Sequence, residues 1–213
     1  MARILIIGAG GHARVVIDAI RAAGEHEIAG LVTADGCGEP VYGVPVVAAD
    51  ADLGRLRSEV DACIIAVGSV GGVTARLRAA QAAQDAGVPL VTIVHPAASV
   101  SAVATLTDGA FVGAGAVVGP GASVGECAIV NSGAVVDHDC NIGAFVHVAP
   151  GAALSGTVSV GDRSHIGTGA SVMQGIRIGA DTVIGVGAVV VDDVPGCVVA
   201  YGNPCRVAHQ RGA

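Results

Sequence analysis

The chain has 213 residues, with 11 lysines and arginines against 18 aspartates and glutamates, and its formal net charge at pH 7 is -7. This balance argues against a nucleic-acid or anionic-membrane partner, because both attract clustered basic side chains. Although 52% of the residues are hydrophobic, no apolar run approaches the roughly 20 residues that cross a bilayer, and the start lacks the pattern of a signal peptide. We therefore expect a cytoplasmic protein.

The first part of the chain alternates two kinds of segment. Aliphatic runs predict buried strands, and apolar residues at helical spacing that stop at a glycine predict helices. The predicted strands cover residues 3–9, 27–32, 62–68 and 89–94, and the predicted helices cover residues 11–24 and 73–87. Alternating strands and helices form a parallel sheet, so we expect an α/β, Rossmann-like domain over residues 1–95.

Residues 96–213 follow a different period. Starting at Val100, sixteen consecutive positions six residues apart are all Val, Ile or Leu, the last being Val190, and glycine often follows them. A period of six is the hexapeptide signature of a parallel β-helix. Each hexad supplies a short strand and a corner, and three hexads complete one triangular coil. The aliphatic side chains fill the interior, and each contributes about 1.5–3 kcal/mol on burial.

This period assigns positions to the histidines of the second domain. His147 and His165 each precede an inward aliphatic residue by one, so they point outward, stacked about 4.8 Å apart on neighbouring strands. His138 lies at a corner, flanked by Asp137 and Asp139, and Gly156 lies next to it in the following coil, which should leave open space over the imidazole. An imidazole with an acidic partner and an open approach is suited to general-base chemistry. The alternative is that these are ordinary surface histidines, and we keep that interpretation for His165.

A glycine-rich turn at residues 8–13, GAGGHA, follows the first predicted strand and opens the first predicted helix. Glycine lets a backbone approach a phosphate, and a helix N-terminus favours negative charge. The spacing differs from the dinucleotide fingerprint, so an ordinary tight strand–helix turn remains the alternative.

Five motifs together resemble the sugar O-acyltransferase family of hexapeptide-repeat proteins. They are IIGAGGHARVVID near the start, HPAASVS at the junction, NSGAVVDHDCNIG and HVAPGAALSG in the repeats, and AYGNPCRV near the end. The family includes PglD-like nucleotide-aminosugar N-acetyltransferases and NeuD-like sialic acid O-acetyltransferases. The resemblance implies a left-handed β-helix, acetyl-CoA as the cosubstrate without a metal, and a homotrimer with the acyl site between subunits.

The resemblance also implies roles for individual residues. His138 matches the catalytic base and Asp139 its acidic partner, which would allow direct transfer from acetyl-CoA to an amine without a covalent enzyme intermediate. His147 and Gly156 match positions beside the thioester, while Thr168 and Val186 match coenzyme contacts on one outer column.

In the amino-terminal domain, the resemblance places the nucleotide-sugar on the glycine-rich turn. Gly10, Gly11, His12 and Gly68 match its binding positions. The family often carries two acids after the second strand, where this chain has Thr33 and Ala34, with Asp35 just after. UDP-sugar is the default, and GDP- and dTDP-sugars stay open. The expected acceptor is a 4-amino-4,6-dideoxy sugar.

Three other functions remain open. The first is O-acetylation of a sugar such as sialic acid. The second is a metalloenzyme like the γ-class carbonic anhydrases, although no His-x4-His pair occurs. The third is a nucleotide-sugar-binding protein without transfer activity. The six scattered cysteines, without a C-x-x-C pair, are expected to be small buried thiols.

Overall fold

The computed structural model describes residues 1–69 and 72–211. Its chain divides into two compact units, the first comprising Met1–Pro96 and the second beginning at Ala97. Among the described residues, no helix has the length and apolar character needed to span a membrane.

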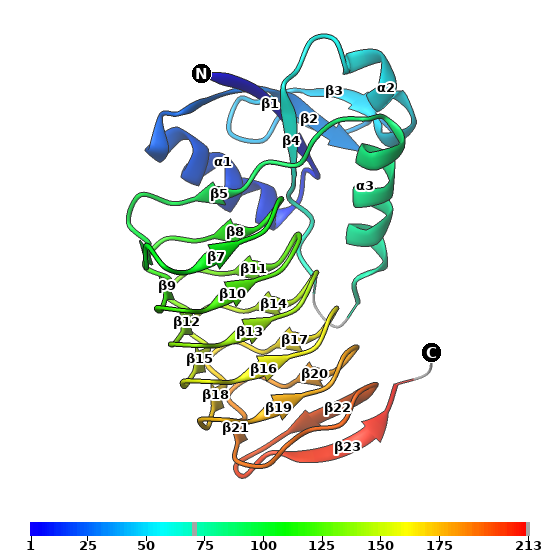
Figure 1. Cartoon of the computed structure of the whole chain (residues 1–213). Helices are drawn as coiled ribbons and strands as arrows, with labels where there is room; N and C mark the ends of the chain where they lie inside the picture. Colours follow the sequence, from blue (N-terminus) through cyan, green and yellow to red (C-terminus); the bar gives the residue numbers. More distant parts are fainter. Residues whose placement is uncertain (70–71, 212–213) are drawn as a thin grey trace. The chain divides into compact units, whose positions relative to one another are not determined.

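The first unit is built on a parallel four-stranded sheet with the strand order β3-β2-β1-β4 (Figure 1). The central strand β1 is apolar over Ile4–Ile7, where every side chain is at most 1% exposed. Its helices include α1, which ends where Gly24 takes φ of +67° and donates its N–H to the carbonyl of Ile20. The elements are β1 (Ala2–Ile7), α1 (Gly11–Ala23), β2 (His26–Thr33), β3 (Val46–Ala49), the 3-10 turn η1 (Asp50–Asp52), α2 (Leu53–Leu56), β4 (Ala62–Ile65), α3 (Thr74–Asp85) and β5 (Ile93–Val94).

The predicted Rossmann-like arrangement is confirmed, with two differences in the strands. The run 62–68 is a strand only to Ile65, where its pairing with β1 ends. The run 89–94 is reduced to the short β5, with one isolated bridge from Leu90 to Cys63. The sequence pattern did not reveal β3 and α2, which have four residues each.

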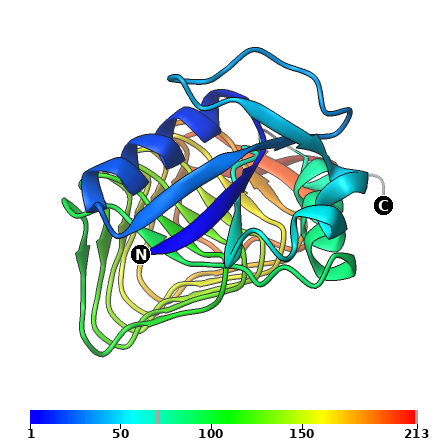
Figure 2. The same cartoon turned by 90° about the horizontal axis from the view of Figure 1, so that it is seen from above.

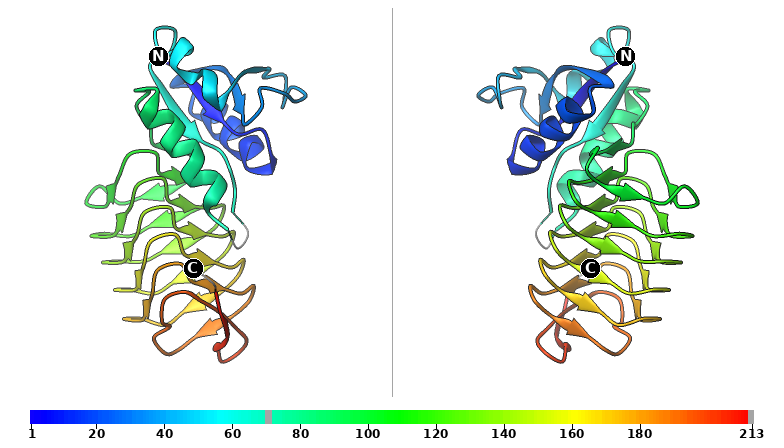
Figure 3. Two further views of the ribbon diagram at one scale, coloured as in Figure 1. Left: turned by 90° about the vertical axis from the view of Figure 1, so that its right-hand side faces the viewer. Right: turned by 90° about the vertical axis from the view of Figure 1, so that its left-hand side faces the viewer.

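The second unit is a parallel β-helix whose strands recur every six residues, as predicted. Figure 2 shows its triangular coils along their axis, and Figure 3 shows them stacked from two sides. The first face contains β6 (Ser99–Val100), β9 (Val117–Val118), β12 (Val135–Val136), β15 (Ala153–Leu154), β18 (Ser171–Val172) and β21 (Val189–Val190). The second face contains β7 (Thr105–Leu106), β10 (Ser123–Val124), β13 (Asn141–Ile142), β16 (Ser159–Val160) and β19 (Arg177–Ile178).

The third face contains β8 (Phe111–Val112), β11 (Ile129–Val130), β14 (His147–Val148), β17 (His165–Ile166), β20 (Val183–Ile184), β22 (Val198–Tyr201) and the antiparallel β23 (Arg206–Gln210). Along each face, residues one full circuit apart pair in register, as Val135 does with Ala153. A residue's position within the three-hexad circuit therefore fixes its column on the coil surface.

Aliphatic side chains fill the interior of the coil. From Val112 to Val190, every sixth residue is at most 3% exposed, whereas Val100 and Leu106 in the first coil remain partly exposed. The repeat forms because each hexad buries one such side chain and then turns through a corner. The predicted left-handed β-helix of hexapeptide repeats is the observed fold of this unit.

The cysteines are all free, and four of them are buried as expected. Cys37 and Cys197 are exposed, so the expectation of buried thiols was wrong for these two. Cys197 lies between β21 and β22, with φ of +57°.

Candidate functional site

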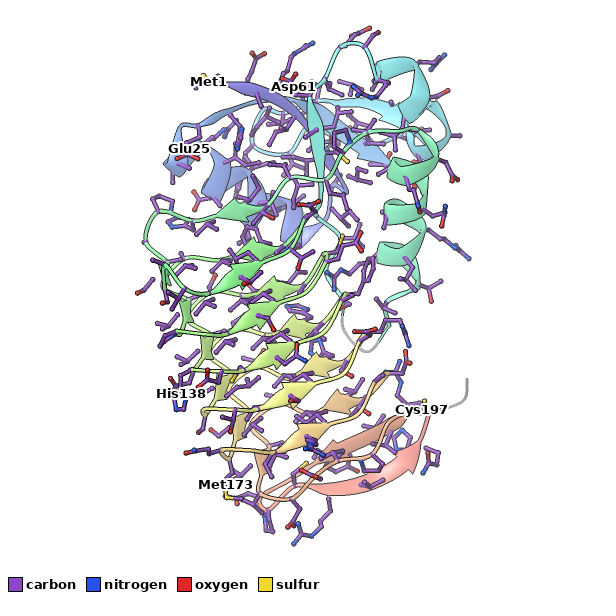
Figure 4. All side chains as sticks on the ribbon, viewed as in Figure 1. Met1, Glu25, Asp61, His138, Met173 and Cys197 are labelled. Atoms are coloured by element: carbon purple, nitrogen blue, oxygen red, sulfur yellow. The ribbon has the colours of Figure 1, made fainter. Side chains whose placement is uncertain are left out.

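His138 lies at the corner between the first and second faces, where β12 has ended and β13 has not begun. Its Nδ1 is 2.9 Å from Oδ2 of Asp139, and its backbone N–H donates to Oδ1 of Asp137 at 2.7 Å. The His138 side chain is 45% exposed and the Asp139 side chain 64%. Figure 4 shows His138 at the outer edge of the coil, on the same side as Met173 of a later coil.

The hydrogen bond to Asp139 fixes the tautomer of the His138 imidazole. A carboxylate accepts hydrogen bonds and cannot donate them, so the proton of a neutral His138 ring is on Nδ1, facing Asp139. The lone pair of Nε2 is then available to take a proton. The hydrogen bond to Asp139 raises the pKa of His138. Partial desolvation opposes this rise, and the negative charges of Asp137 and Asp139 add to it.

Gly156 lies one coil below His138, as predicted, but the expected open space is not there. The imidazole itself lies over Gly156, and a Cβ added to this glycine would collide with Nε2 and lie 2.9 Å from Cδ2. The ring rests on the glycine because the backbones of the two coils are joined there, with the N–H of Thr157 donating to the carbonyl of His138 at 2.8 Å. Gly156 therefore supports the imidazole and leaves its outer side open.

His147 is on the third face, and its side chain is shielded from solvent although it points outward. Its side chain points away from the coil interior, yet the residue is only 7% exposed, which corrects the expectation of an outward, uncovered histidine. Ile129 pairs with it on the preceding strand, and the ring of His165 packs against it edge-on, with centroids 4.9 Å apart. Both of these residues lie in its own column on the third face.

Asn131, a residue that the sequence analysis missed, fixes the tautomer of His147. Its Oδ1 accepts the N–H of Ser132 at 2.9 Å, and its Nδ2 lies 3.0 Å from Nε2 of His147. Since the amide nitrogen can only donate, Nε2 is the acceptor and the proton of His147 is on Nδ1. Asn131 precedes His147 by almost one circuit of the coil, and this spacing is the signal that could have revealed it.

Thr168 and Val186 share a column, as predicted, with the N–H of Gly187 donating to the carbonyl of Thr168 at 2.9 Å. Both are exposed, Val186 by 78%. Their corner joins the third face to the first, whereas His138 lies at the corner between the first and second faces. Within one chain, the structure therefore brings His138, Asp139 and Gly156 together and places Thr168 and Val186 at a different corner.

The glycine-rich turn of the first unit leads from β1 into α1. A Cβ built on Gly10 or Gly11 would meet no atom within 4 Å, so the backbone is open on that side. His12 is 8% exposed, and burial, with a contribution from the charge of Arg76, lowers its pKa to about 4. Gly68 follows β4, and a Cβ there would lie 3.4 Å from Cβ of His12, so the structure brings these positions together.

Asp35 is at the end of the second strand and caps its own loop. Its Oδ1 accepts the N–H of Cys37 at 3.0 Å and lies 3.3 Å from the hydroxyl of Thr33. Arg76, which the sequence analysis did not single out, is 1% exposed on α3. The available signal was its spacing of three and seven residues from Ala79 and Ala83, which places all three on one face of the helix.

Within one chain, the described residues contain no group of three or more His, Cys, Asp and Glu side chains that could hold a metal ion.

Residues 3–77 match the family model of the PglD N-terminal domain. The chain is similar to a histidine-to-alanine variant of GDP-perosamine N-acetyltransferase from Caulobacter crescentus, whose structure contains CoA and GDP-perosamine. The identity is 43%, the match covers 99% of this chain and 98% of the other, and the TM-score is 0.92. None of the curated proteins matches the chain.

The chain belongs to the PglD/NeuD-like family of hexapeptide-repeat sugar acyltransferases. A second relative is the acetyltransferase domain of PglB from Neisseria gonorrhoeae in complex with acetyl coenzyme A, at 37% identity over 97% of this chain and 99% of the other, with a TM-score of 0.88. WeeI from Acinetobacter baumannii shares the fold, with 24% identity over 98% of this chain and 100% of the other and a TM-score of 0.80. The predicted family and enzyme class, an acyltransferase, are thereby confirmed, whereas the roles of individual residues stay predictions.

Proposed function

We propose that this acyltransferase moves the acetyl group of acetyl-CoA to the amino group of a nucleotide-linked amino sugar. The observation that carries the proposal is the pair of His138 and Asp139, in which Nδ1 of a half-exposed imidazole bonds the carboxylate and Nε2 is left to act as the base. Two relatives support the choice of substrates, since one was solved with CoA and GDP-perosamine and another with acetyl coenzyme A.

The proposed reaction needs one general base, and His138 supplies it. As the neutral amine nitrogen of the sugar forms a bond to the thioester carbonyl carbon, Nε2 of His138 takes one of its protons. The carbon–sulfur bond then breaks, and the departing CoA thiolate receives this proton from the imidazolium. Asp139 keeps Nδ1 protonated and stabilises the imidazolium that forms after Nε2 has taken the proton. No serine or cysteine nucleophile takes part.

The two corners of the β-helix suggest how the coenzyme is held. If Thr168 and Val186 contact the pantetheine arm, they cannot do so beside His138 of the same chain, because the first face separates the two corners. A cyclic trimer brings the Thr168 corner of one chain to the His138 corner of its neighbour. We therefore propose a homotrimer with three acyl sites, each shared by two chains.

In this proposal, the two units have different roles, nucleotide binding and acetyl transfer. The first unit, built around Gly10, Gly11, His12 and Gly68, binds the nucleotide, and Asp35 orders the neighbouring loop. The second unit carries the acetyl transfer, with His147 and Gly156 beside the thioester.

The activity is tested by following CoA release with acetyl-CoA and a panel of UDP-, GDP- and dTDP-linked 4-amino-4,6-dideoxy sugars. The same panel with a hydroxyl in place of the amine, together with sialic acid, distinguishes N- from O-acetylation. We expect turnover with an amino sugar and little with the hydroxyl analogues. Tight sugar binding without any CoA release would instead favour a non-catalytic binding protein.

The shared site is tested by mixing two inactive variants. His138→Ala removes the base, and Val186→Glu places a charge on the proposed coenzyme column. After the two proteins are unfolded and refolded together, some interfaces combine an intact His138 with an intact Val186, and activity should return. If each site were made by one chain alone, the mixture would stay as inactive as its components.

A further inference from the structure

A cavity of about 350 Å³ in the first unit lies beside the glycine-rich turn, and no part of the proposed acetyl transfer uses it. Ala9 of that turn lines it, together with Arg14, Glu39 and Tyr42. This volume is within the range of sites for small organic ligands, about 300–1,000 Å³. The cavity therefore has room for one part of the substrate next to the turn proposed for the phosphates.

Tyr42 is held in this cavity by a tight turn. Val41 and Val44 exchange two backbone hydrogen bonds of 3.0 Å, and both residues between them have positive φ, +49° for Tyr42 and +78° for Gly43. The carbonyl of Tyr42 also accepts a hydrogen bond of 2.9 Å from Nη2 of Arg21. A bulky residue at positive φ is strained, and such strain is typical of functional positions.

Tyr42 is 59% exposed, in a chain with only two tyrosines, two phenylalanines and no tryptophan. Cζ of Arg14 lies 5.9 Å from the ring centroid. A phenol ring and a guanidinium both stack on flat aromatic groups. Together they are suited to hold a planar heterocycle, such as the base of a nucleotide.

The base would be connected to the glycine-rich turn through the rest of the nucleotide. Arg14 is the fourth residue of α1, and side chains of a helix lean toward its N-terminus. Ala9 lines the cavity, while Gly10 and Gly11 leave the adjacent backbone open. A base in the cavity therefore leaves its diphosphate near the start of α1, where the helix favours negative charge.

The side chain of Glu39 would distinguish guanine from uracil and thymine. Its ionised carboxylate only accepts hydrogen bonds, through two adjacent oxygens. The Watson–Crick edge of guanine offers two adjacent donors, its N1–H and its exocyclic amino group. Uracil and thymine offer one N–H between two carbonyl oxygens, which the carboxylate would repel.

We propose that Tyr42, Arg14 and Glu39 form a guanine site, so that the acetyl acceptor is a GDP-linked amino sugar. This inference rests on the proposed function, since it names the nucleotide of that same substrate. It favours GDP over the UDP that the family resemblance gave as the default.

The test measures binding of GDP, UDP and dTDP to the full-length protein by isothermal titration calorimetry. We expect GDP to bind at least 10-fold more tightly than the other two. Glu39→Gln should weaken GDP binding about 10- to 100-fold, the loss expected when hydrogen bonds to a charged group are removed, and should not weaken UDP binding. Glu25→Gln makes the same charge change in an exposed loop outside the cavity and should leave all three affinities unchanged.

The role of Tyr42 is tested with Tyr42→Asn, because asparagine tolerates positive φ and keeps the turn while removing the ring. This variant should weaken the binding of every nucleotide. Equal affinities for GDP and UDP, or an unchanged GDP affinity in Glu39→Gln, would overturn the guanine site. Turnover with a UDP-sugar but not a GDP-sugar would overturn it too and leave the acetyltransferase proposal intact. GDP binding with no acetyl transfer to any amino sugar would refute the transferase and leave the guanine site standing.

Discussion

Asp139 contacts the imidazole of His138, its neighbour in the chain, because it adopts a left-handed backbone conformation. Consecutive side chains of a strand point to opposite sides, but at this corner φ of Asp139 is +56° and its Oδ2 comes within 2.9 Å of Nδ1 of His138. The N–H of Asp139 donates to the carbonyl of Pro120 at 3.0 Å, which fixes the corner to the preceding coil. The pair is therefore positioned by the repeat itself.

Replacing His138 by alanine should lower kcat about 10²- to 10⁴-fold, the usual range for loss of a general base. The fold should persist, because the side chain is 45% exposed and the backbone bonds of residue 138 do not involve the ring. The measurements are kcat from CoA release and the free energy of unfolding. A near-normal kcat would remove His138 from the mechanism.

Asp139→Asn should shift the pH dependence of kcat/KM. The base is the unprotonated ring, so activity is present above its pKa and is lost as the pH falls through it. Asp139 raises the pKa of His138 above its ordinary value of 6.5, so the acid limb of the variant should move to lower pH. Asp137→Asn removes a charge and keeps the ring bond, so it should give a smaller shift in the same direction. An unmoved acid limb in Asp139→Asn would contradict this coupling.

Gly156→Ala should impair catalysis without unfolding the protein. The added methyl group would occupy the place of the imidazole, and the partly exposed ring can move aside at little cost to stability. We expect kcat to fall by at least about 10-fold, because catalysis is sensitive to small misplacements of the base. Gly54→Ala is the control, since a Cβ there meets no atom within 4 Å. Similar kcat values for the two variants would mean that the ring position is unimportant.

His12 should make the protein sensitive to acid. Burial, assisted by Arg76, lowers its pKa from 6.5 to about 4. The unfolded chain then binds the proton more readily, so the stabilisation is complete above about pH 6.5 and is lost as the pH falls toward 4, by roughly 3 kcal/mol. Imidazole NMR should give a pKa near 4, and His12→Gln should reduce the acid dependence of the free energy of unfolding. A pKa near 6.5 would contradict the prediction.

Leu154→Ala should reduce the free energy of unfolding by about 2–5 kcal/mol, because the side chain is 1% exposed inside the coil and its removal leaves a cavity. Val103→Ala, at a residue that is 69% exposed, should change it by less than about 0.5 kcal/mol. Urea titrations followed by circular dichroism compare the two. Equal losses would contradict the assignment of Leu154 to the interior.

The architecture could be predicted because a repeat leaves a strong periodic signal. Each hexad contributes one short strand and one corner, so the position of Val136 fixed the corner of His138, and a shift of one full circuit fixed Gly156 as its neighbour. The short elements β3 and α2 cannot carry a period, and the sequence pattern missed them for that reason.

The details of the site depended on side-chain conformations that the period does not encode. The imidazole of His138 itself lies over Gly156, and Asn131, which directly follows the strand paired with that of His147, turns its amide toward the ring. Alternation gave the direction of His147 correctly, but it could not show that this residue is only 7% exposed. The position of each site residue along the coil was thus predictable from the sequence, whereas the solvent exposure of its side chain was not.

The register of three hexads per circuit limits how the β-helix can change in length. An insertion of a single hexad between His138 and Thr168 would rotate everything after it by one face and carry Thr168 to another edge of the prism. Adding one whole circuit would keep every column in line and only lengthen the coil. A change in the length of this domain that preserves the proposed shared site must therefore add or remove complete turns.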